Sequence, residues 1–387
     1  MVTFIIGNGF DIRVGLKTKY PDFYEVYSKC QKEDSKTIIE FKDNILKDKS
    51  HGWKNWSDFE LQMGKHSNEF QGKTLIEDFI ECFNDFVTSF NKYLESECES
   101  IEWSAVSAAD KRNFSSSIIN FYKHLTQVRQ DKIKKRINRR ASVNFLQLNY
   151  TNAFDNMLDM KNPRLFDEVN QYEHNYIGVL GKNLHLHGVF GKGGYMTMGV
   201  DNESQIKNAS MNTDSRINKI FVKPRFLDAL QARNVNQDSH RAKAEHVIGN
   251  SSIICIYGAS IGDTDGFWWE KVGNWLKKSQ GTLIIFDTCG ADDDGISPKA
   301  FLDMELSIAQ RRDEITERFL RLANLENDWV TKNPDRLFVE LDTKMFDFKL
   351  PRKGRTLSNT EIDKALISNE KVDKALFKEI ATAIVDK

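Results

Sequence analysis

The first sixteen residues of the chain, Met1–Leu16, read MVTFIIGNGFDIRVGL. A short apolar run is followed by two glycines that flank an asparagine and then, two residues later, by an aspartate. This pattern is typical of a buried β-strand that ends in a tight turn and leads into a helix. Such a turn can bring backbone N–H groups close to a phosphate, although a single G-x-G also occurs at ordinary corners. The stretch predicts an α/β fold and leaves its chemistry open.

Five further apolar runs predict strands that are buried on both faces. They are rich in β-branched and aromatic residues, and several end in Gly, Asn or Asp. Because these runs lack polar alternation, they favour a mostly parallel sheet flanked by helices, an α/β fold of Rossmann-like type. The six expected strands are Val2–Ile6, Val143–Leu148, Asn183–Leu186, Ile253–Tyr257, Thr282–Phe286 and Leu337–Leu341.

The connection between the first two strands exceeds 130 residues and is too long to lack structure of its own. Within it, large apolar residues recur at spacings of three and four, which predicts a helix with one apolar face packed in a core. These residues are Phe79, Phe83, Phe86, Phe90 and Leu94. We therefore expect a nucleotide-binding sheet domain (1–20 plus 141–345), a helical insertion (21–140), and a C-terminal linker and helix (346–387).

Bulk composition excludes several classes of protein. Lys and Arg total 55 against 56 Asp and Glu, so no global field attracts nucleic acid or an anionic membrane. The longest strongly apolar stretch, Ile253–Ala259, is far shorter than the roughly 20 residues of a membrane span. No cationic leader precedes Gly7, which predicts a cytoplasmic location. The five cysteines form no C-x-x-C pair, so we expect reduced thiols and no zinc ribbon.

Charge is segregated inside the expected insertion. Eight acids and one base lie between Glu77 and Glu102, whereas eight bases and one acid lie between Lys123 and Arg140. A basic helix can bind the phosphates of a nucleic acid by releasing counterions. It can equally pair with the acidic segment or face water, and the nearby acidic segment favours that interpretation.

Residues that could carry chemistry follow the expected strands. Because the carboxyl ends of parallel strands meet at one edge of a sheet, we expect these residues to converge there. Glycines would approach a phosphate or simply form turns, and the aspartates would bind ribose or cap helices. Asn149 could orient a ribose hydroxyl or a water, or stabilise a local turn. The candidates are Gly7, Gly9, Asp11, Asn149, His187, Gly258, Ser260, Gly262, Asp263 and Asp265.

The spacing of two histidines allows either a metal site or a proton-transfer site. His185 and His187 would lie on the same side of a strand and could together bind a metal, but no cysteine at ligand spacing accompanies them. We therefore predict no metal. His187 precedes Gly188 and would lie nearer the sheet edge, where an imidazole can move a proton at neutral pH.

Five sequence blocks, in order from Ile5 to Trp269, together resemble the AbiH family of bacteriophage abortive-infection proteins. AbiH proteins in turn are similar to the SIR2-like NAD-binding fold, whose defence members hydrolyse NAD. The resemblance implies an effector that cleaves the nicotinamide–ribose bond of NAD or a related nucleotide when a phage-derived trigger or a partner defence protein activates it. It leaves homo-oligomerisation open. The blocks are IIGNGFDIRVGLKTKYPDF, NWSDFE, LNYTNAFD, LHLHGVFG and YGASIGDTDGFWW.

The resemblance also implies roles for individual residues. The SIR2-type G-A-G-x-S motif falls on Gly7–Asp11, with Asn8 and Asp11 in place of Ala and Ser. The Asn of Q-N-x-D falls on Asn149 and its Asp on Thr151. The catalytic His-Gly falls on His187–Gly188, and the later G-x-S falls on Gly258–Ser260. His187 and Asn149 are thus expected to be catalytic, with NAD as the bound substrate. The zinc module of sirtuin deacylases is absent, which argues against deacylation.

Two other classes of function remain open. The chain could be a nucleotide-binding sensor or nuclease toxin that grips nucleic acid with the basic segment 123–140, although no metal-binding acid cluster typical of a nuclease is visible. It could also be an assembly module that binds a nucleotide without turning it over. NAD loss, salt-dependent retention of nucleic acid, or neither would distinguish the three.

Overall fold

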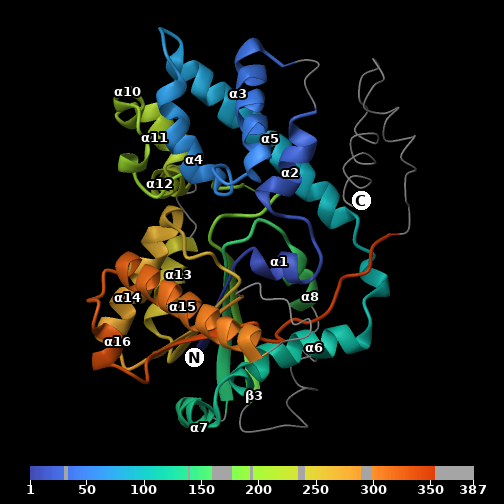
Figure 1. The fold of residues 1–387 in the computed structure, drawn as a ribbon, viewed down its shortest axis with the longest axis vertical. Helices are drawn as coiled ribbons and strands as arrows, with labels where there is room; N and C mark the ends of the chain where they lie inside the picture. The colour runs from blue at the N-terminus through green and yellow to red at the C-terminus, as the bar shows by residue number, and fades with distance from the viewer. Residues whose placement is uncertain are drawn as a thin grey trace.

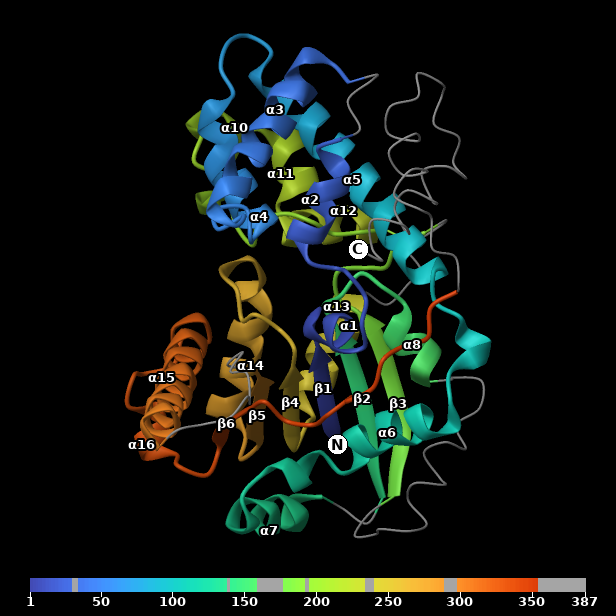
Figure 2. The ribbon, with the colours of Figure 1, turned by 45° about the vertical axis from the view of Figure 1, so that its right-hand side comes forward.

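A six-stranded sheet, in which every strand runs parallel to its neighbours, forms the centre of the molecule (Figures 1 and 2). The computed structural model describes residues 1–29, 34–137, 140–158, 177–191, 195–233, 240–288 and 298–353. All six expected strands are present, two of them longer at the amino end than expected. They are β1 (Val2–Ile6), β2 (Arg140–Gln147), β3 (Ile177–His185), β4 (Ile253–Tyr257), β5 (Thr282–Asp287) and β6 (Leu337–Leu341).

The strand order is β3-β2-β1-β4-β5-β6, which confirms the predicted Rossmann-like α/β class. The chain adds β2 and β3 on one side of β1, then returns to add β4 on the other side. Sheet growth therefore reverses between β1 and β4. From the turns after these two strands the chain continues to opposite faces of the sheet, and open α/β sheets bind ligands at such a point. Figure 2 shows the carboxyl ends of the strands facing a separate layer of helices above them.

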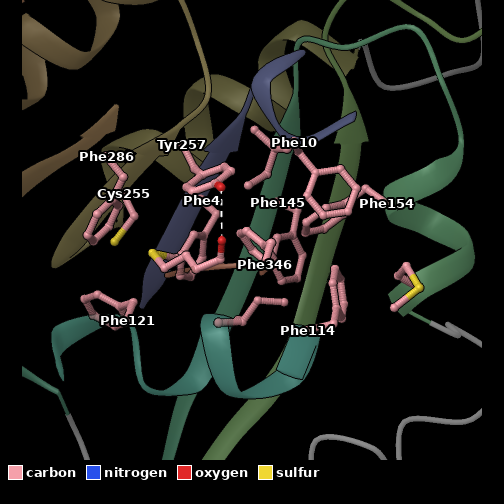
Figure 3. Close-up of a cluster of buried hydrophobic side chains, with 14 of the residues drawn as sticks. Phe4, Phe10, Phe114, Phe121, Phe145, Phe154, Cys255, Tyr257, Phe286 and Phe346 are labelled. Atoms are coloured by element: carbon pink, nitrogen blue, oxygen red, sulfur yellow. Dashed lines mark hydrogen bonds between the residues drawn. The ribbon is translucent and has the colours of Figure 1, made fainter. Parts of the chain in front are cut away.

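Both faces of the sheet are covered, because strand side chains alternate between two apolar cores. On one face Phe4 stacks on Phe145, and Phe10 makes edge contacts with Phe114 and Phe346 (Figure 3). This face carries α1 (Gly9–Arg13), α6 (Ala108–Ile119), α7 (Gln127–Arg136) and α8 (Ala153–Leu158). The opposite face carries α13 (His240–Gly249), α14 (Gly266–Lys278), α15 (Pro298–Leu322) and α16 (Trp329–Lys332).

A third core lies in the helical layer above the sheet. The apolar stripe expected between Phe79 and Leu94 is buried there, as predicted. Phe86 stacks on Phe59, and Phe79 contacts Phe221 from a much later part of the chain. The layer contains α2 (Tyr20–Tyr27), α3 (Lys36–Lys47), α4 (Phe59–His66), α5 (Leu75–Glu99), α10 (Ala209–Asn212), α11 (Ser215–Phe221) and α12 (Lys223–Arg233).

Core packing crosses the boundaries expected from the sequence. Helices α6 and α7, within the expected insertion, pack on the sheet, whereas α10 and α11 join the upper layer. The start of the expected linker is also packed: Phe346 and Leu350 are buried, and Arg352 pairs with Glu97. The apolar side chains of Phe346 and Leu350 account for this burial. The division into folding units stays a prediction, and the helix expected from Ser358 lies outside the described residues.

The acidic and basic segments lie at opposite ends of the molecule, since α5 belongs to the upper layer and α7 lies at the far end of the sheet (Figure 2). The basic helix therefore pairs elsewhere: Arg129 Nη1 is 2.7 Å from Glu340 Oε1, and Lys132 Nζ is 2.6 Å from Asp335 Oδ1. Part of its charge is thus compensated near β6, and nucleic-acid binding by α7 stays a prediction.

The turn after β1 packs directly against the turn after β4. Gly9 N donates to Gly258 O (2.8 Å), and a Cβ on Gly9 would lie 2.5 Å from Gly258 Cα. A Cβ on Gly7 would lie 2.6 Å from Ala259 Cα, and Gly258 itself has a φ of +64°. These glycines are required for close backbone contact at the switch point, and their role in phosphate binding stays a prediction.

Replacing Gly9 with Ala should lower the free energy of unfolding by about 1–3 kcal/mol, because the two backbones must separate to admit the methyl group. Urea unfolding measures the change. Gly249→Ala is the matched control, since a Cβ there meets nothing within 4 Å. Equal stability of the two variants would contradict the close-packed turn.

Candidate functional site

A small pocket lies at the carboxyl edge of the sheet, between the loop after β4 and the start of α12. Its free internal space is about 10 Å³, roughly the room of one water molecule. The pocket therefore brings together residues from the loop after β3, the loop after β4 and the upper layer, but its present form holds no nucleotide-sized space. Residues that line it include His187, Asp201, Lys223, Arg241, Asp265 and Phe267.

His187 is buried with its ring fixed by the backbone. Nδ1 lies 3.0 Å from Leu148 O, and because a carbonyl only accepts, Nδ1 carries the proton. Nε2 lies 2.9 Å from Asp265 Oδ1, but the two atoms are not aligned as a hydrogen bond. Neutral His187 therefore presents a lone pair at Nε2, the form required of a proton acceptor, and protonated His187 pairs with Asp265.

Lys223, the first residue of α12, is the centre of a buried ion network. Its Nζ lies 2.7 Å from Glu60 Oε2 and 2.9 Å from Asp265 Oδ1, and only 5% of its side chain is exposed. Tyr150 OH donates to the other oxygen of Glu60 (2.9 Å). The network thus joins α4 and α12 of the upper layer to the short helix η6 (Asp263–Asp265) and to Tyr150, both at the sheet edge.

The charges of this network shift one another. Burial alone would raise the pKa of Asp265, but the Lys223 ammonium and the His187 imidazole outweigh it and hold that pKa well below its usual range. Burial also opposes the charge of Lys223, yet Asp265 and Glu60 raise its pKa above the ordinary value. Lys223 and Asp265 therefore remain ionised at neutral pH.

Carboxylates outnumber cations around the pocket. Besides Glu60 and Asp265, burial and the charge of Glu60 raise the pKa of Asp58 to about 6, and burial raises the pKa of Asp201. Arg241 lies over the Phe267 ring at the rim, where its guanidinium already contacts carboxylates outside the pocket. The lining itself is balanced, with Asp201 and Asp265 against Lys223 and Arg241, and the excess of carboxylates comes from Glu60 and Asp58, which lie outside it.

Asp11, Asn149 and Thr151 form a separate buried cluster beside the pocket. Thr151 Oγ1 donates to Asp11 Oδ2 (2.7 Å), and Asn149 Nδ2 donates to Asp11 Oδ1 (3.2 Å). Asn149 Oδ1 is buried without a partner. The structure thus brings these three expected residues together, but none of them lines the pocket of His187. A role for Asn149 at the reacting bond requires this free oxygen to receive the ligand.

The other expected residues lie apart. Asn8 exchanges hydrogen bonds with Thr18 and so fixes the loop after α1. Ser260 is exposed, and Asp263 pairs with Arg321 of α15 at 2.8 Å. Asp265 alone of the GDTD stretch reaches His187 through its carboxylate. Binding roles for Asn8, Ser260 and Asp263 stay predictions.

His185 and His187, whose spacing would have allowed a metal site, have different partners. His185 is the last residue of β3 and lies 3.0 Å from Asp155 Oδ2, whereas His187 continues into the loop towards Asp265. The strand ends between them, so the imidazoles do not share one site. Among the described residues, no three His, Cys, Asp or Glu side chains are grouped as metal ligands.

The sequence blocks that contain these residues lie within the region that matches a known family. The family model described as bacteriophage abortive infection AbiH matches residues 3–287, which contain β1 without its first residue, β2 to β5 and every candidate site residue. The chain belongs to the AbiH family. This AbiH protein therefore has a role in bacteriophage abortive infection. A search of curated proteins found no match. Similarity to SIR2-like proteins stays a prediction.

Sequence reasoning about the AbiH protein missed Lys223 and Tyr150. Glu60 closes the NWSDFE block that carried the family resemblance, so a signal for it existed. Lys223 stands in FVKPRF, where nothing distinguishes it from a surface lysine. Only the fold, by placing α12 above η6, shows its partners. The described helices also include none long and apolar enough to cross a membrane.

Replacing Lys223 with Met should lower the free energy of unfolding by about 3–5 kcal/mol, because Glu60 and Asp265 lose their buried counter-ion. Chemical unfolding tests this. Lys332→Met, which removes an exposed ammonium with two carboxylate partners, is the control and should change stability far less, because water screens an exposed ion pair. Similar losses in the two variants would contradict the role of the buried network.

The pH dependence of stability should report Asp11. Burial raises its pKa to about 7 despite the Thr151 and Asn149 bonds, whereas an unfolded Asp titrates near about 3.9. Between these values the folded state retains a proton that the unfolded state releases, so this group's contribution falls as pH rises from about 4 to about 7. Asp11→Asn should reduce that loss by about 4 kcal/mol.

Unfolding measured at several pH values tests this expectation. Asp335→Asn, at an exposed ion pair with Lys132, should keep the wild-type slope. An unchanged slope in Asp11→Asn would show that the Asp11 carboxyl is ionised in the folded protein at pH 5.

Proposed function

We propose that this AbiH protein is an abortive-infection effector that hydrolyses the nicotinamide–ribose bond of NAD or a related nucleotide. The observation that carries the proposal is the buried His187. It lies in a pocket at the carboxyl edge of a 3-2-1-4-5-6 sheet, its Nδ1 proton is fixed by Leu148 O, and its Nε2 faces Asp265. This arrangement suits a proton acceptor beside a nucleotide-binding edge.

The carboxylates in and around the pocket support a cationic substrate. NAD carries a pyridinium ring that departs as neutral nicotinamide, leaving an oxocarbenium-like ribose. Glu60, Asp201 and Asp265 would stabilise positive charge that develops there, while Lys223 prevents the carboxylates from repelling one another. Fixed charges that match the transition state lower the barrier without reorganisation. A phosphate would meet repulsion from the same carboxylates, so the pyrophosphate must bind elsewhere along the sheet edge.

The His187–Asp265 pair would take up the proton released in the reaction. Water attacks the anomeric carbon as the carbon–nitrogen bond breaks, and the products are nicotinamide, ADP-ribose and one proton. His187 Nε2 accepts that proton and its positive charge is then balanced by Asp265. Asn149 Oδ1, the free acceptor next to Leu148, is available for a ribose hydroxyl.

Substrate entry requires the upper layer to move. The present pocket has room for about one water, and the Glu60–Lys223–Asp265 contacts hold α4 and α12 against the sheet edge. The nucleotide must therefore separate these contacts as it binds.

His187→Gln should reduce NAD consumption by roughly 10²–10⁴-fold, the usual cost of losing a proton-transfer residue. NAD and nicotinamide are measured by chromatography, both with the purified protein and in phage-challenged cells. His246→Gln, an exposed histidine on α13, is the matched control and should match the wild type. The proposal fails if no NAD or related nucleotide is lost under any condition, or if His187→Gln consumes it at the wild-type rate.

A further inference from the structure

A second polar cluster lies at the carboxyl ends of β2 and β3, outside the pocket of His187. It consists of Gln147, Asp155, Asn183 and His185. Gln147 Nε2 donates to Asp155 Oδ2 (3.1 Å) and to Asn183 Oδ1 (2.7 Å). Asn183 Nδ2 donates to Asp155 Oδ1 (2.6 Å). The Asp155 carboxylate, from α8, thus gathers the side chains of two adjacent strands.

These bonds fix which atoms remain free. His185 Nε2 lies 3.0 Å from Asp155 Oδ2, and a carboxylate only accepts, so Nε2 carries the proton and Nδ1 of the neutral ring is an acceptor. The amide nitrogen of Gln147 is identified by its two acceptors, which leaves Oε1 as the free end. Both His185 Nδ1 and Gln147 Oε1 are buried and have no hydrogen-bond partner.

The free atoms define the chemistry of what would fill the cluster. Buried polar atoms in folded proteins are almost always hydrogen-bonded, so two buried acceptors call for a group that donates. The pyrophosphate of a dinucleotide has no proton to donate at neutral pH and would meet the charge of Asp155. A metal ion would find a single carboxylate and one imidazole, with no grouped ligand set among the described residues. A neutral group with hydroxyls fits best.

We propose that Gln147 and His185 form a subsite for ribose hydroxyls of the nucleotide substrate. The inference rests on the proposed function, which supplies the ribose. Three consecutive residues connect the two places: Leu148 O fixes His187, and the side chains of its neighbours Gln147 and Asn149 carry free acceptors. Asp155 and Asn183 are positioning residues, because they hold the donors of the cluster away from the ligand.

The test compares the binding of ADP-ribose with that of two analogues, one lacking a hydroxyl on the adenosine ribose and one lacking a hydroxyl on the terminal ribose. Titration calorimetry is performed on the full chain and on His185→Gln, Gln147→Met and the control His246→Gln. The wild type and the control should bind ADP-ribose about tenfold more tightly than the analogue that lacks the hydroxyl held by the subsite, on whichever of the two riboses it lies. This is the effect of one or two hydrogen bonds. His185→Gln and Gln147→Met should lose that preference.

Melting temperatures establish that each variant folds. Two variants are used so that the test can still be made if one of them does not fold. An unchanged preference in both variants overturns the subsite, as does the absence of any preference in the wild type, which would indicate that water alone fills the cluster. Failure of all three compounds to bind also overturns it. The proposed function is decided separately by NAD loss: preference without hydrolysis rejects only the function, and hydrolysis without preference rejects only the subsite.

Discussion

The buried ammonium of Lys223, in contact with Glu60 and Asp265, is the interaction on which the site depends. One charge from α12 binds a carboxylate from the upper helical layer and another from the sheet edge. Removing any partner leaves an unpaired charge out of water. The network therefore fixes the position of the upper helical layer relative to the sheet. The same contacts place Asp265 beside His187 and close the pocket to about one water molecule. Organisation of the site and restriction of its access therefore have a common physical cause.

The parallel sheet explains why distant parts of the chain meet at this edge. Its order returns the chain from β3 across β2 and β1 to β4, so the loop carrying Asp265 lies above the end of β3. Residues 147–149 at the end of β2 then contact three different clusters in succession. Gln147 binds Asp155, Leu148 O binds His187, and Asn149 binds Asp11. The end of β2 thus sets the distance between the pocket of His187 and the free acceptor atoms of Gln147 and Asn149.

Much of the fold could be predicted from the sequence, because most strands are short apolar runs; β3 (IGVLGKNLH) is the exception, and only its last three residues were expected. The family could also be predicted, since its motifs occur in order. The site could be predicted only in part. His187 and Asp265 meet as two loop residues of one edge should, but Lys223 carries no local signal and its role arises from tertiary pairing. Gly7 and Gly9 show the converse: close contact with Gly258 and Ala259 already requires glycine at both positions, so the motif alone does not distinguish packing from phosphate binding. The charge segregation of α5 and α7 left two alternatives, pairing of the two segments or exposure to water, and the fold excludes the pairing by placing the helices apart.

The central claim is that the loops after β1, β2, β3 and β4 surround one nucleotide. A crystal structure of the protein soaked with or grown in ADP-ribose tests it most directly. We expect ligand density at the carboxyl edge, with the terminal ribose between His187 Nε2 and Asn149 Oδ1 and with α4 and α12 moved away from Asp265. A nucleotide bound on another face, or an occupied edge in which His187 remains covered by Asp265, would contradict it.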